Sequence, residues 1–394
     1  MSRGHLVKED IRTSRLLKQI SKIAKSPVLE ASAMPPQVYH SEDFFKLEKE
    51  QLFARDWICV GREDNTRAPG DFLTWKLGDQ PIFAIRGEDS TLRAFSNVCL
   101  HRMMPLLEGT GNSKTIVCPY HAWTYGNDGS LRNAPLIEKK VQAHLKRKRL
   151  PRIRLEIWKG WIYVTLNKDA KSVASQLEKL EPVVSPYQME NYVSVVHRDY
   201  TWQTNWKLLV ENFMEGYHLP VVHNKTVGRW FPSKKTKFPR QRCNSFTYQT
   251  FIKDETALYG GAHKKNKKLR GIQRHTSIMP TIFPSHMYVL APDHLWYLTL
   301  NPINLGEVKI RFGLSLAPEV NQSLKNNSSF VSDMDDFFEK VNAEDKKIVE
   351  ALFESTSSLL AAPGPLSWLE REIHDFIVYL SKRLNRRTFE GSNQ

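Results

Sequence analysis

The stretches Cys99-Leu-His101 and Cys118-Pro-Tyr-His121 decide the fold of the first half of this 394-residue chain. Each stretch carries one thiol and one imidazole. Two thiolates on one iron and two imidazoles on the other are the ligands of a Rieske [2Fe–2S] cluster. Residues 102–117 separate the stretches and are enough for an outgoing and a returning strand that bring both loops to one cluster. The pattern predicts a [2Fe–2S] cluster held by these four side chains.

A zinc site is the main alternative for the same four residues. Common Cys₂His₂ zinc sites pair cysteine with cysteine and histidine with histidine along the chain, whereas each stretch here carries one of each. With only four cysteines, at 59, 99, 118 and 243, a disulfide framework is not expected. Free cysteines are typical of a reducing compartment, so we expect a cytoplasmic protein.

The sequence around the two stretches is typical of a small all-β domain. Residues 57–167 contain short β-prone runs separated by turn residues such as Ala68-Pro-Gly70 and Asn127-Asp-Gly129. Residues 1–56 are predicted to form a helical segment that packs on the second domain. Their basic character also suits an organelle-targeting segment, although Glu9 and Asp10 argue against one.

The remaining residues, 168–394, mix longer helical patterns with strands. Antiparallel strands are expected within 286–318, and helices around 205–217, 333–355 and 369–384. We therefore predict an α+β fold. Its parts are a small all-β Rieske domain and a larger catalytic domain in which helices flank an antiparallel sheet, a helix-grip-like arrangement.

A second motif, Glu215-Gly-Tyr-His218-Leu-Pro-Val-Val-His223, offers two imidazoles and a carboxylate to one small ion. On the predicted helix, Glu215 and His218 are three residues apart and share a face. Pro220 is expected to end the helix, so that His223 can return beside His218. The two histidines are predicted ligands of one metal ion.

The buried face of that helix is predicted from its periodicity, and the expected members are Trp206, Val210, Phe213 and Tyr217.

A third metal ligand is predicted on a later helix, where Asp345 interrupts an apolar stripe. The stripe consists of Phe338, Val341, Ile348 and Leu352. A bare buried carboxylate is costly, so Asp345 must be paired or bound to metal. The alternative is an exposed Asp345 between Glu344 and Lys346. Two histidines and one carboxylate form the triad of non-haem Fe(II) oxygenases.

The composition is that of an ordinary globular protein, with 41% hydrophobic and 25% charged residues. No apolar run has membrane-spanning length, so an integral membrane protein is not expected. The net charge is +15. Nucleic-acid binding is not expected, because no nucleic-acid motif accompanies the excess. An acidic electron-transfer protein is a more fitting partner.

Both motifs resemble segments of Rieske oxygenase α subunits, the ring-hydroxylating family. Cys99-Leu-His-Arg-Met-Met-Pro-Leu106 and Cys118-Pro-Tyr-His-Ala-Trp-Thr-Tyr125 are similar to the Rieske segment, although Met103 and Ala122 stand where that family usually has glycine. Around the second motif, Asn205-Trp-Lys, Glu211-Asn-Phe and Tyr217-His218 are similar to the catalytic segment. Asn342-Ala-Glu-Asp345 is similar to the segment that supplies the third iron ligand. The resemblance runs from about residue 40 to the C-terminus.

The resemblance implies a terminal oxygenase with a [2Fe–2S] cluster and one Fe(II). It implies that electrons come from NAD(P)H through a reductase, with or without a separate ferredoxin, to insert oxygen from O₂ into a small organic substrate. In this family an acidic residue at the place of Glu215 bridges the iron to the Rieske histidine of a neighbouring subunit. A homotrimer is therefore expected. Asn212 is expected close to the iron.

Two questions stay open at the level of sequence. A Rieske electron carrier without catalysis of its own is the alternative function, although it leaves the second histidine pair unexplained. The substrate is either an aromatic compound or a quaternary ammonium compound, and Glu215 in place of aspartate resembles the branch that oxidises the latter. Such a cation would need an aromatic cage, for which the candidates are Trp230, Tyr288, Trp296 and Tyr297.

Overall fold

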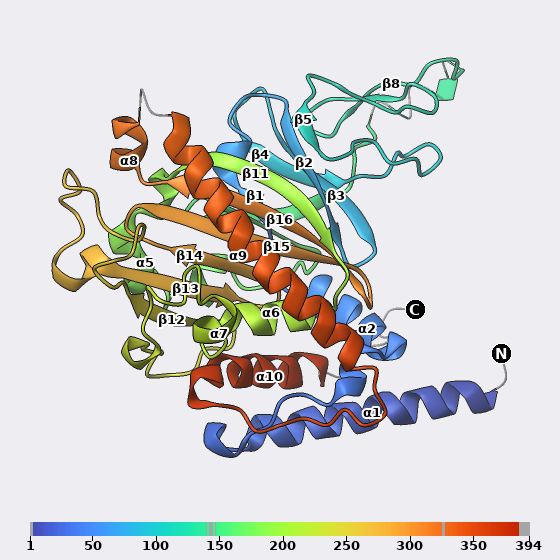
Figure 1. The fold of residues 1–394 in the computed structure, drawn as a ribbon. Helices are drawn as coiled ribbons and strands as arrows, with labels where there is room; N and C mark the ends of the chain where they lie inside the picture. Colours follow the sequence, from blue (N-terminus) through green and yellow to red (C-terminus); the bar gives the residue numbers. More distant parts are fainter. Residues whose placement is uncertain (1–2, 139, 142–144, 146, 325–327, 386–394) are drawn as a thin grey trace. The chain divides into compact units, whose positions relative to one another are not determined.

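The computed structural model describes residues 3–138, 140–141, 145, 147–324 and 328–385 (Figure 1). The chain forms two compact units. The β unit is Phe53–Ser175, and the mixed unit combines Met1–Leu52 with Gln176–Gln394. The predicted Rieske range 57–167 lies within the β unit. The last nine residues of the predicted catalytic range, 386–394, lie outside the described residues.

Two antiparallel sheets build the β unit. The larger has the strand order β1-β10-β9-β4-β3-β2-β5, and the smaller has the order β6-β7-β8. A short helix, η4 (Glu63–Asn65), follows β1. The strands are β1 Ile58–Arg62, β2 Asp71–Leu77, β3 Gln80–Arg86, β4 Leu92–Ser96, β5 Thr110–Asn112, β6 Ile116–Val117, β7 Thr124–Tyr125, β8 Leu131–Asn133, β9 Arg152–Trp158 and β10 Trp161–Thr165.

The hydrophobic core of the β unit includes both cysteines of the predicted cluster site. Cys99 and Cys118 pack with Phe83 and Phe95 of the larger sheet and with Tyr125 of the smaller one. The cysteine ends of both loops are therefore anchored in packed structure.

A six-stranded antiparallel sheet forms the centre of the mixed unit, with the order β11-β16-β15-β14-β13-β12. The antiparallel strands expected within 286–318 are confirmed as β14, β15 and β16. The strands are β11 Val193–Trp202, β12 Phe246–Ile252, β13 Thr276–Ile282, β14 His286–Leu290, β15 His294–Asn304 and β16 Glu307–Leu316.

Helices cover this sheet, and α9 crosses one of its faces (Figure 1). Helix α6 contacts α9, β13 and β15, so it lies on the same face. The α-helices are α1 Arg3–Lys25, α2 Glu42–Glu48, α4 Val173–Gln176, α5 Glu181–Val184, α6 Trp206–Met214, α7 Leu219–Val222, α8 Pro318–Ser323, α9 Ser328–Ser355 and α10 Arg371–Leu384. The 3₁₀ helices of the mixed unit are η1 Val28–Glu30, η2 Pro36–Tyr39, η5 Ser185–Tyr187, η6 Met189–Asn191, η7 Ser233–Lys235, η8 Gly271–His275 and η9 Trp368–Glu370, and η3 Lys49–Phe53 is a π-helix.

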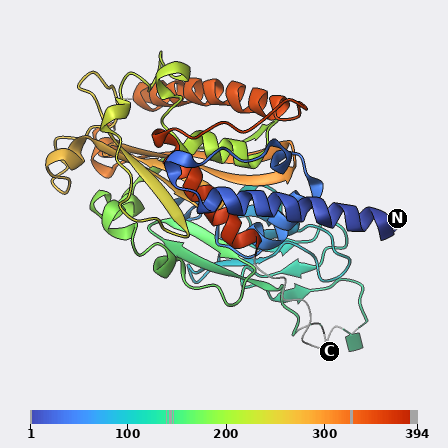
Figure 2. The same cartoon turned by 90° about the horizontal axis from the view of Figure 1, so that it is seen from below.

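The N-terminal helix α1 packs against α10, and Figure 2 shows the two helices crossing. Leu16 and Ile20 of α1 are buried. His374 of α10 contacts the backbone carbonyl of Ile23 at 3.1 Å through Nε2. The N-terminal segment is thus an integral part of the mixed unit. None of the helices in the described parts of the chain is both long and apolar enough to cross a membrane.

Candidate active site

Two loops with the same backbone pattern carry the predicted cluster ligands. In the first, the amide of Cys99 donates to the carbonyl of Met104 (2.9 Å), and the amide of Met103 donates to the carbonyl of Cys99 (3.1 Å). In the second, Cys118 donates to Trp123 (2.8 Å) and Ala122 donates to Cys118 (3.0 Å). Each loop therefore turns back just after its histidine.

The residue that follows each histidine-containing turn is strained. Met103 and Ala122 both have a φ of 55°, a left-handed conformation that glycine adopts without strain and that costs other residues about 1–2 kcal/mol. These are the two positions where the resembling family usually has glycine. Both loops keep the turn geometry, and the backbone at Met103 and Ala122 is strained because each residue has a side chain.

Of the four predicted cluster ligands, the two cysteines are buried and the two histidines are exposed. Cys99 and Cys118 are buried, whereas His101 and His121 are exposed, with their ring centroids 4.6 Å apart. The Sγ of Cys99 lies 3.2 Å from the Tyr125 hydroxyl. Two thiols at a packed base and two neighbouring imidazoles at a tip fit the donor set of a Rieske cluster.

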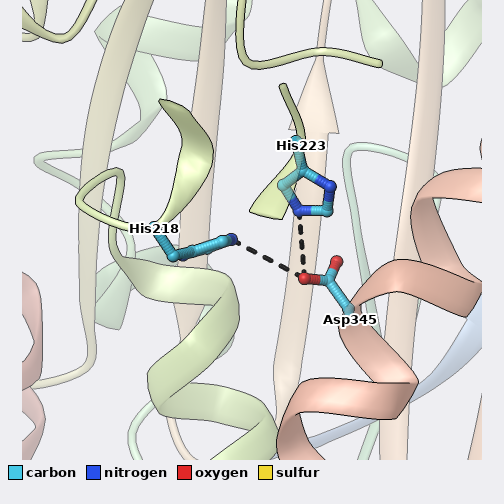
Figure 3. A group of neighbouring side chains, drawn as sticks. All are labelled: His218, His223 and Asp345. Atoms are coloured by element: carbon cyan, nitrogen blue, oxygen red, sulfur yellow. Dashed lines mark hydrogen bonds and ion pairs between the residues drawn. The ribbon is translucent and has the colours of Figure 1, made fainter. Parts of the chain in front are cut away.

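In the mixed unit, His218, His223 and Asp345 converge (Figure 3). Their potential ligand atoms all lie within 4.8 Å of one another. One oxygen of Asp345 is 3.0 Å from Nε2 of His223 and 3.6 Å from Nε2 of His218. Two imidazoles and one carboxylate therefore face a single point between α9 and the segment after α6.

The local backbone around the histidines differs from the helical expectation. Helix α6 ends at Met214, and Glu215 is extended (φ −118°, ψ 153°), so Glu215 and His218 do not share a helical face. Pro220 lies in the first turn of the short helix α7 rather than ending a longer helix. Tyr217 is 60% exposed and does not belong to the predicted buried stripe, whose other members are buried.

The apolar stripe on α9 was predicted correctly at one end only. Phe338 and Val341 are buried, but Leu352 is 44% exposed, and the buried residue in that turn is Val349. Because an α-helix has 3.6 residues per turn, the face of α9 that packs on the core shifts gradually around the helix. That face runs through residues 341, 345 and 349. Asp345 is only partly exposed and lies on this core side.

Each histidine is oriented by a glutamate carboxylate that contacts its Nδ1 atom. Nδ1 of His218 contacts Glu215, which also accepts the backbone amide of His218 at 3.0 Å. Nδ1 of His223 lies 2.7 Å from Glu344. Carboxylate oxygens accept hydrogen bonds, so each Nδ1 is placed to donate to its glutamate. Each Nε2 is directed at Asp345. Glu344 was not foreseen as a functional residue. Its only signal in the sequence is its position beside Asp345.

The electrostatics of the site favour a cation among these groups. Burial lowers the pKa of His223, but the hydrogen bonds and charges of Asp345 and Glu344 outweigh burial, and the pKa is raised. An imidazole flanked by two carboxylates attracts a positive charge, and a divalent ion among the three ligand atoms would take the place of that proton. The donor set and the carboxylates behind both histidines fit a mononuclear metal site.

The three residues line a pocket whose lining also contains many aromatic residues. Asn212 and Glu215 also line it. Of the expected cage aromatics, Trp230 and Trp296 line the pocket. Tyr288 and Tyr297 are buried outside its lining. Tyr297 follows Trp296 on β15 and so faces the other side of the sheet, and Tyr288 of β14 is paired with Tyr297 on that side. The other aromatic lining residues are Phe213, Phe231, Phe251, Tyr259, Phe337 and Phe338.

Comparison with known families decides between the possible classes of such a site. The model of the ring hydroxylating alpha subunit catalytic domain matches residues 189–385, and that of the Rieske [2Fe-2S] domain matches residues 56–151. The chain belongs to the ring hydroxylating alpha subunit family. Each histidine motif falls inside the expected family domain.

Its curated relatives include quaternary ammonium oxygenases. The chain is 35% identical over 197 residues to the carnitine monooxygenase oxygenase subunit of Escherichia coli (strain K12), covering 49% of this chain and 53% of the relative. It therefore spans about half the length of that relative. It is 26% identical to the glycine betaine monooxygenase oxygenase subunit of Pseudomonas aeruginosa (strain UCBPP-PA14), with 91% of each chain covered. Choline monooxygenase of Arabidopsis thaliana is also 26% identical, over 91% of this chain and 85% of that one.

Solved structures share the fold of this chain. The quaternary ammonium Rieske monooxygenase CntA with L-carnitine has a TM-score of 0.75 at 24% identity, covering 90% of this chain and 96% of that chain. Naphthalene 1,2-dioxygenase from Rhodococcus sp. has a TM-score of 0.75 at 17% identity, covering 94% and 98%. The predicted α+β architecture with its Rieske domain is confirmed.

Proposed function

We propose that this chain is the terminal oxygenase of a Rieske non-haem iron system and that its substrate is a small quaternary ammonium compound. The observation that carries the proposal is the convergence of His218, His223 and Asp345 at an aromatic pocket. The chain's second set of metal donors, in the β unit, supports an electron supply to that site.

The two metal groups would be held by different parts of the chain. Cys99, His101, Cys118 and His121 would hold the [2Fe–2S] cluster. Iron held by His218, His223 and Asp345 would supply the activation of O₂, in which a C–H bond, O₂, two electrons and two protons give C–OH and water.

The chain's own residues position the metal and shape the pocket. Glu215 and Glu344 fix both imidazoles with Nε2 directed inward, which sets the tautomer needed for coordination. The aromatic walls exclude water from the substrate. Glu215 is also the proposed bridge to a Rieske histidine of a neighbouring subunit, in a homotrimer.

The substrate class follows from the walls of the pocket. Ring faces attract quaternary ammonium ions through cation–π contact. Trp230 stacks on Phe337 (centroids 4.9 Å apart), and Trp296 packs against Phe338 (5.6 Å), so a nearly continuous aromatic wall is available. Neither Lys nor Arg is present among the described residues that line the pocket. An aromatic acid would lack the cationic clamp that it needs.

We expect a cytoplasmic enzyme that receives electrons from NAD(P)H through a reductase, with or without a separate ferredoxin. The test is O₂ uptake by the iron-loaded protein with NADH and a Rieske-system reductase, in the presence of choline, L-carnitine, glycine betaine, benzoate or naphthalene. Aldehyde formation and O₂ uptake that depend on a quaternary ammonium compound are the expected result. Turnover of benzoate or naphthalene alone would contradict the proposed substrate class.

A further inference from the structure

The pocket contains a second polar pair, distinct from the metal-site residues. His294, the first residue of β15, lines the pocket, and its Nδ1 lies 2.7 Å from a carboxylate oxygen of the preceding Asp293. The other oxygen of Asp293 accepts the backbone amide of Gly260 at 2.8 Å. Both side chains are buried. The hydrogen bonds of Asp293 therefore fix the orientation of the His294 imidazole.

This arrangement determines which nitrogen a ligand can reach. Both oxygens of Asp293 accept hydrogen bonds, as expected for an ionised carboxylate, so Nδ1 of His294 carries the hydrogen. Nε2 is then the ring nitrogen available to a ligand in the pocket. In the neutral imidazole this atom offers a lone pair and accepts a hydrogen bond.

The surroundings of His294 suit a cationic substrate bound nearby. The ring of His294 contacts Phe338 (centroids 5.3 Å apart) and Tyr259 (6.3 Å). These rings belong to the aromatic wall proposed to attract the ammonium group. A second positive charge on His294 would repel that group in a poorly solvated pocket. The pair Asp293–His294 with a neutral imidazole carries a net negative charge, which suits a cation.

We propose that Nε2 of His294 accepts a hydrogen bond from the hydroxyl group of a quaternary ammonium alcohol and selects this alcohol over a carboxylate-bearing betaine. The inference rests on the proposed function, because it assumes that the ammonium group occupies the aromatic wall. A carboxylate would face a lone pair instead of a donor at Nε2. The described lining residues include no Lys or Arg to bind it.

The experiment is calorimetric titration of the iron-loaded protein with choline, glycine betaine and tetramethylammonium. Wild type is compared with His294→Phe, which keeps a ring and removes the acceptor, and with His294→Gln, whose amide oxygen can still accept. In wild type, choline is expected to bind more tightly than the other two. His294→Phe should weaken choline binding about three- to tenfold, the worth of one hydrogen bond, and change tetramethylammonium binding less than twofold. His294→Gln should recover part of the loss.

The outcomes separate the two proposals. Retained tetramethylammonium binding in His294→Phe shows that the variant is folded and its aromatic wall intact. If choline affinity is then unchanged, or if glycine betaine loses most, the hydroxyl-acceptor role of His294 is wrong while the quaternary ammonium pocket stands. If none of the three cations binds wild type, the proposed substrate class fails, and this inference fails with it.

Discussion

Nδ1 of His223 lies 2.7 Å from a carboxylate oxygen of Glu344. Glu344 directly precedes Asp345, so the neighbour of one proposed metal ligand orients another, His223. The hydroxyl of Thr226 donates to the same oxygen at 2.7 Å. One turn of α9 therefore supplies both Asp345, which faces the metal position, and the group that orients His223.

Replacing Glu344 should weaken the mononuclear metal site and leave the cluster intact. Loss of a hydrogen-bonded partner behind a metal-bound imidazole typically costs about 10–100-fold in metal affinity. Glu344→Ala is expected to lower Fe(II) affinity within this range, as measured by chelator competition. Glu354→Ala, an exposed change on the same helix, is the matched control. Equal affinities in the two variants would contradict the role of Glu344.

Gly228 should be intolerant of any side chain. A Cβ at this position would lie 2.0 Å from the carbonyl oxygen of Leu219 and 2.8 Å from that of His223, so backbone would have to move. Gly228→Ala is expected to deplete the mononuclear iron, measured as iron per chain, while the Rieske EPR signal remains. In Gly364→Ala, where a Cβ meets nothing within 4 Å, normal iron content is expected. Full iron content in Gly228→Ala would show that the 219–223 segment is not fixed by this contact.

Glycine should relieve the strain in both cluster loops. Met103→Gly and Ala122→Gly remove a left-handed non-glycine residue, worth about 1–2 kcal/mol, against about 0.5–1 kcal/mol of added unfolded-state entropy. Each change should raise the unfolding midpoint of the cluster-loaded protein slightly. The reverse change, Gly109→Ala at a φ of 67° with no Cβ contact within 4 Å, should lower it. Lower midpoints in both glycine variants would mean that the side chains stabilise the loops by packing.

The buried carboxyl of Glu211 should make stability depend on pH. Burial raises its pKa to about 8, although the Tyr39 hydroxyl, which donates to it at 2.8 and 3.0 Å, and Lys207 oppose the rise. The folded state then holds a proton that the unfolded state loses near pH 4.5. The resulting stabilisation is complete at low pH and is lost as pH rises through 8, by up to about 1.4 kcal/mol per pH unit.

Glu211→Gln tests this sign, because glutamine resembles the protonated acid. The variant should show a flatter dependence of unfolding free energy on pH between 5 and 8 than wild type, measured by urea unfolding. Glu354→Gln, an exposed carboxylate on α9, serves as the control and should keep the wild-type slope. An unchanged slope in Glu211→Gln would show that Glu211 is ionised in the folded protein.

The sequence was informative where chemistry requires specific residue types. The cysteines and histidines at 99, 101, 118 and 121 and the pair at 218 and 223 stand out, because few other roles explain such spacing. Asp345 was found because a carboxylate on an apolar stripe needs a partner. Each of these inferences depends on residues close together in the chain.

The sequence was uninformative where tertiary packing decides. Tyr217 and Leu352 fit helical stripes but are exposed, because α6 ends at Met214 and the buried face of α9 drifts. Glu344 and His294 acquire their places only when distant segments meet. Glu344 contacts a histidine 121 residues away, and His294 lines a pocket together with residues of α6 and α9.

Iron and acid-labile sulfide content, with EPR of the anaerobically purified protein, tests the central claim most directly. The account predicts three irons and two sulfides per chain with a rhombic Rieske signal on reduction. In His218→Ala it predicts two irons with the same signal. Two irons in wild type even after Fe(II) reconstitution would contradict a mononuclear site and favour a Rieske electron carrier without catalysis of its own.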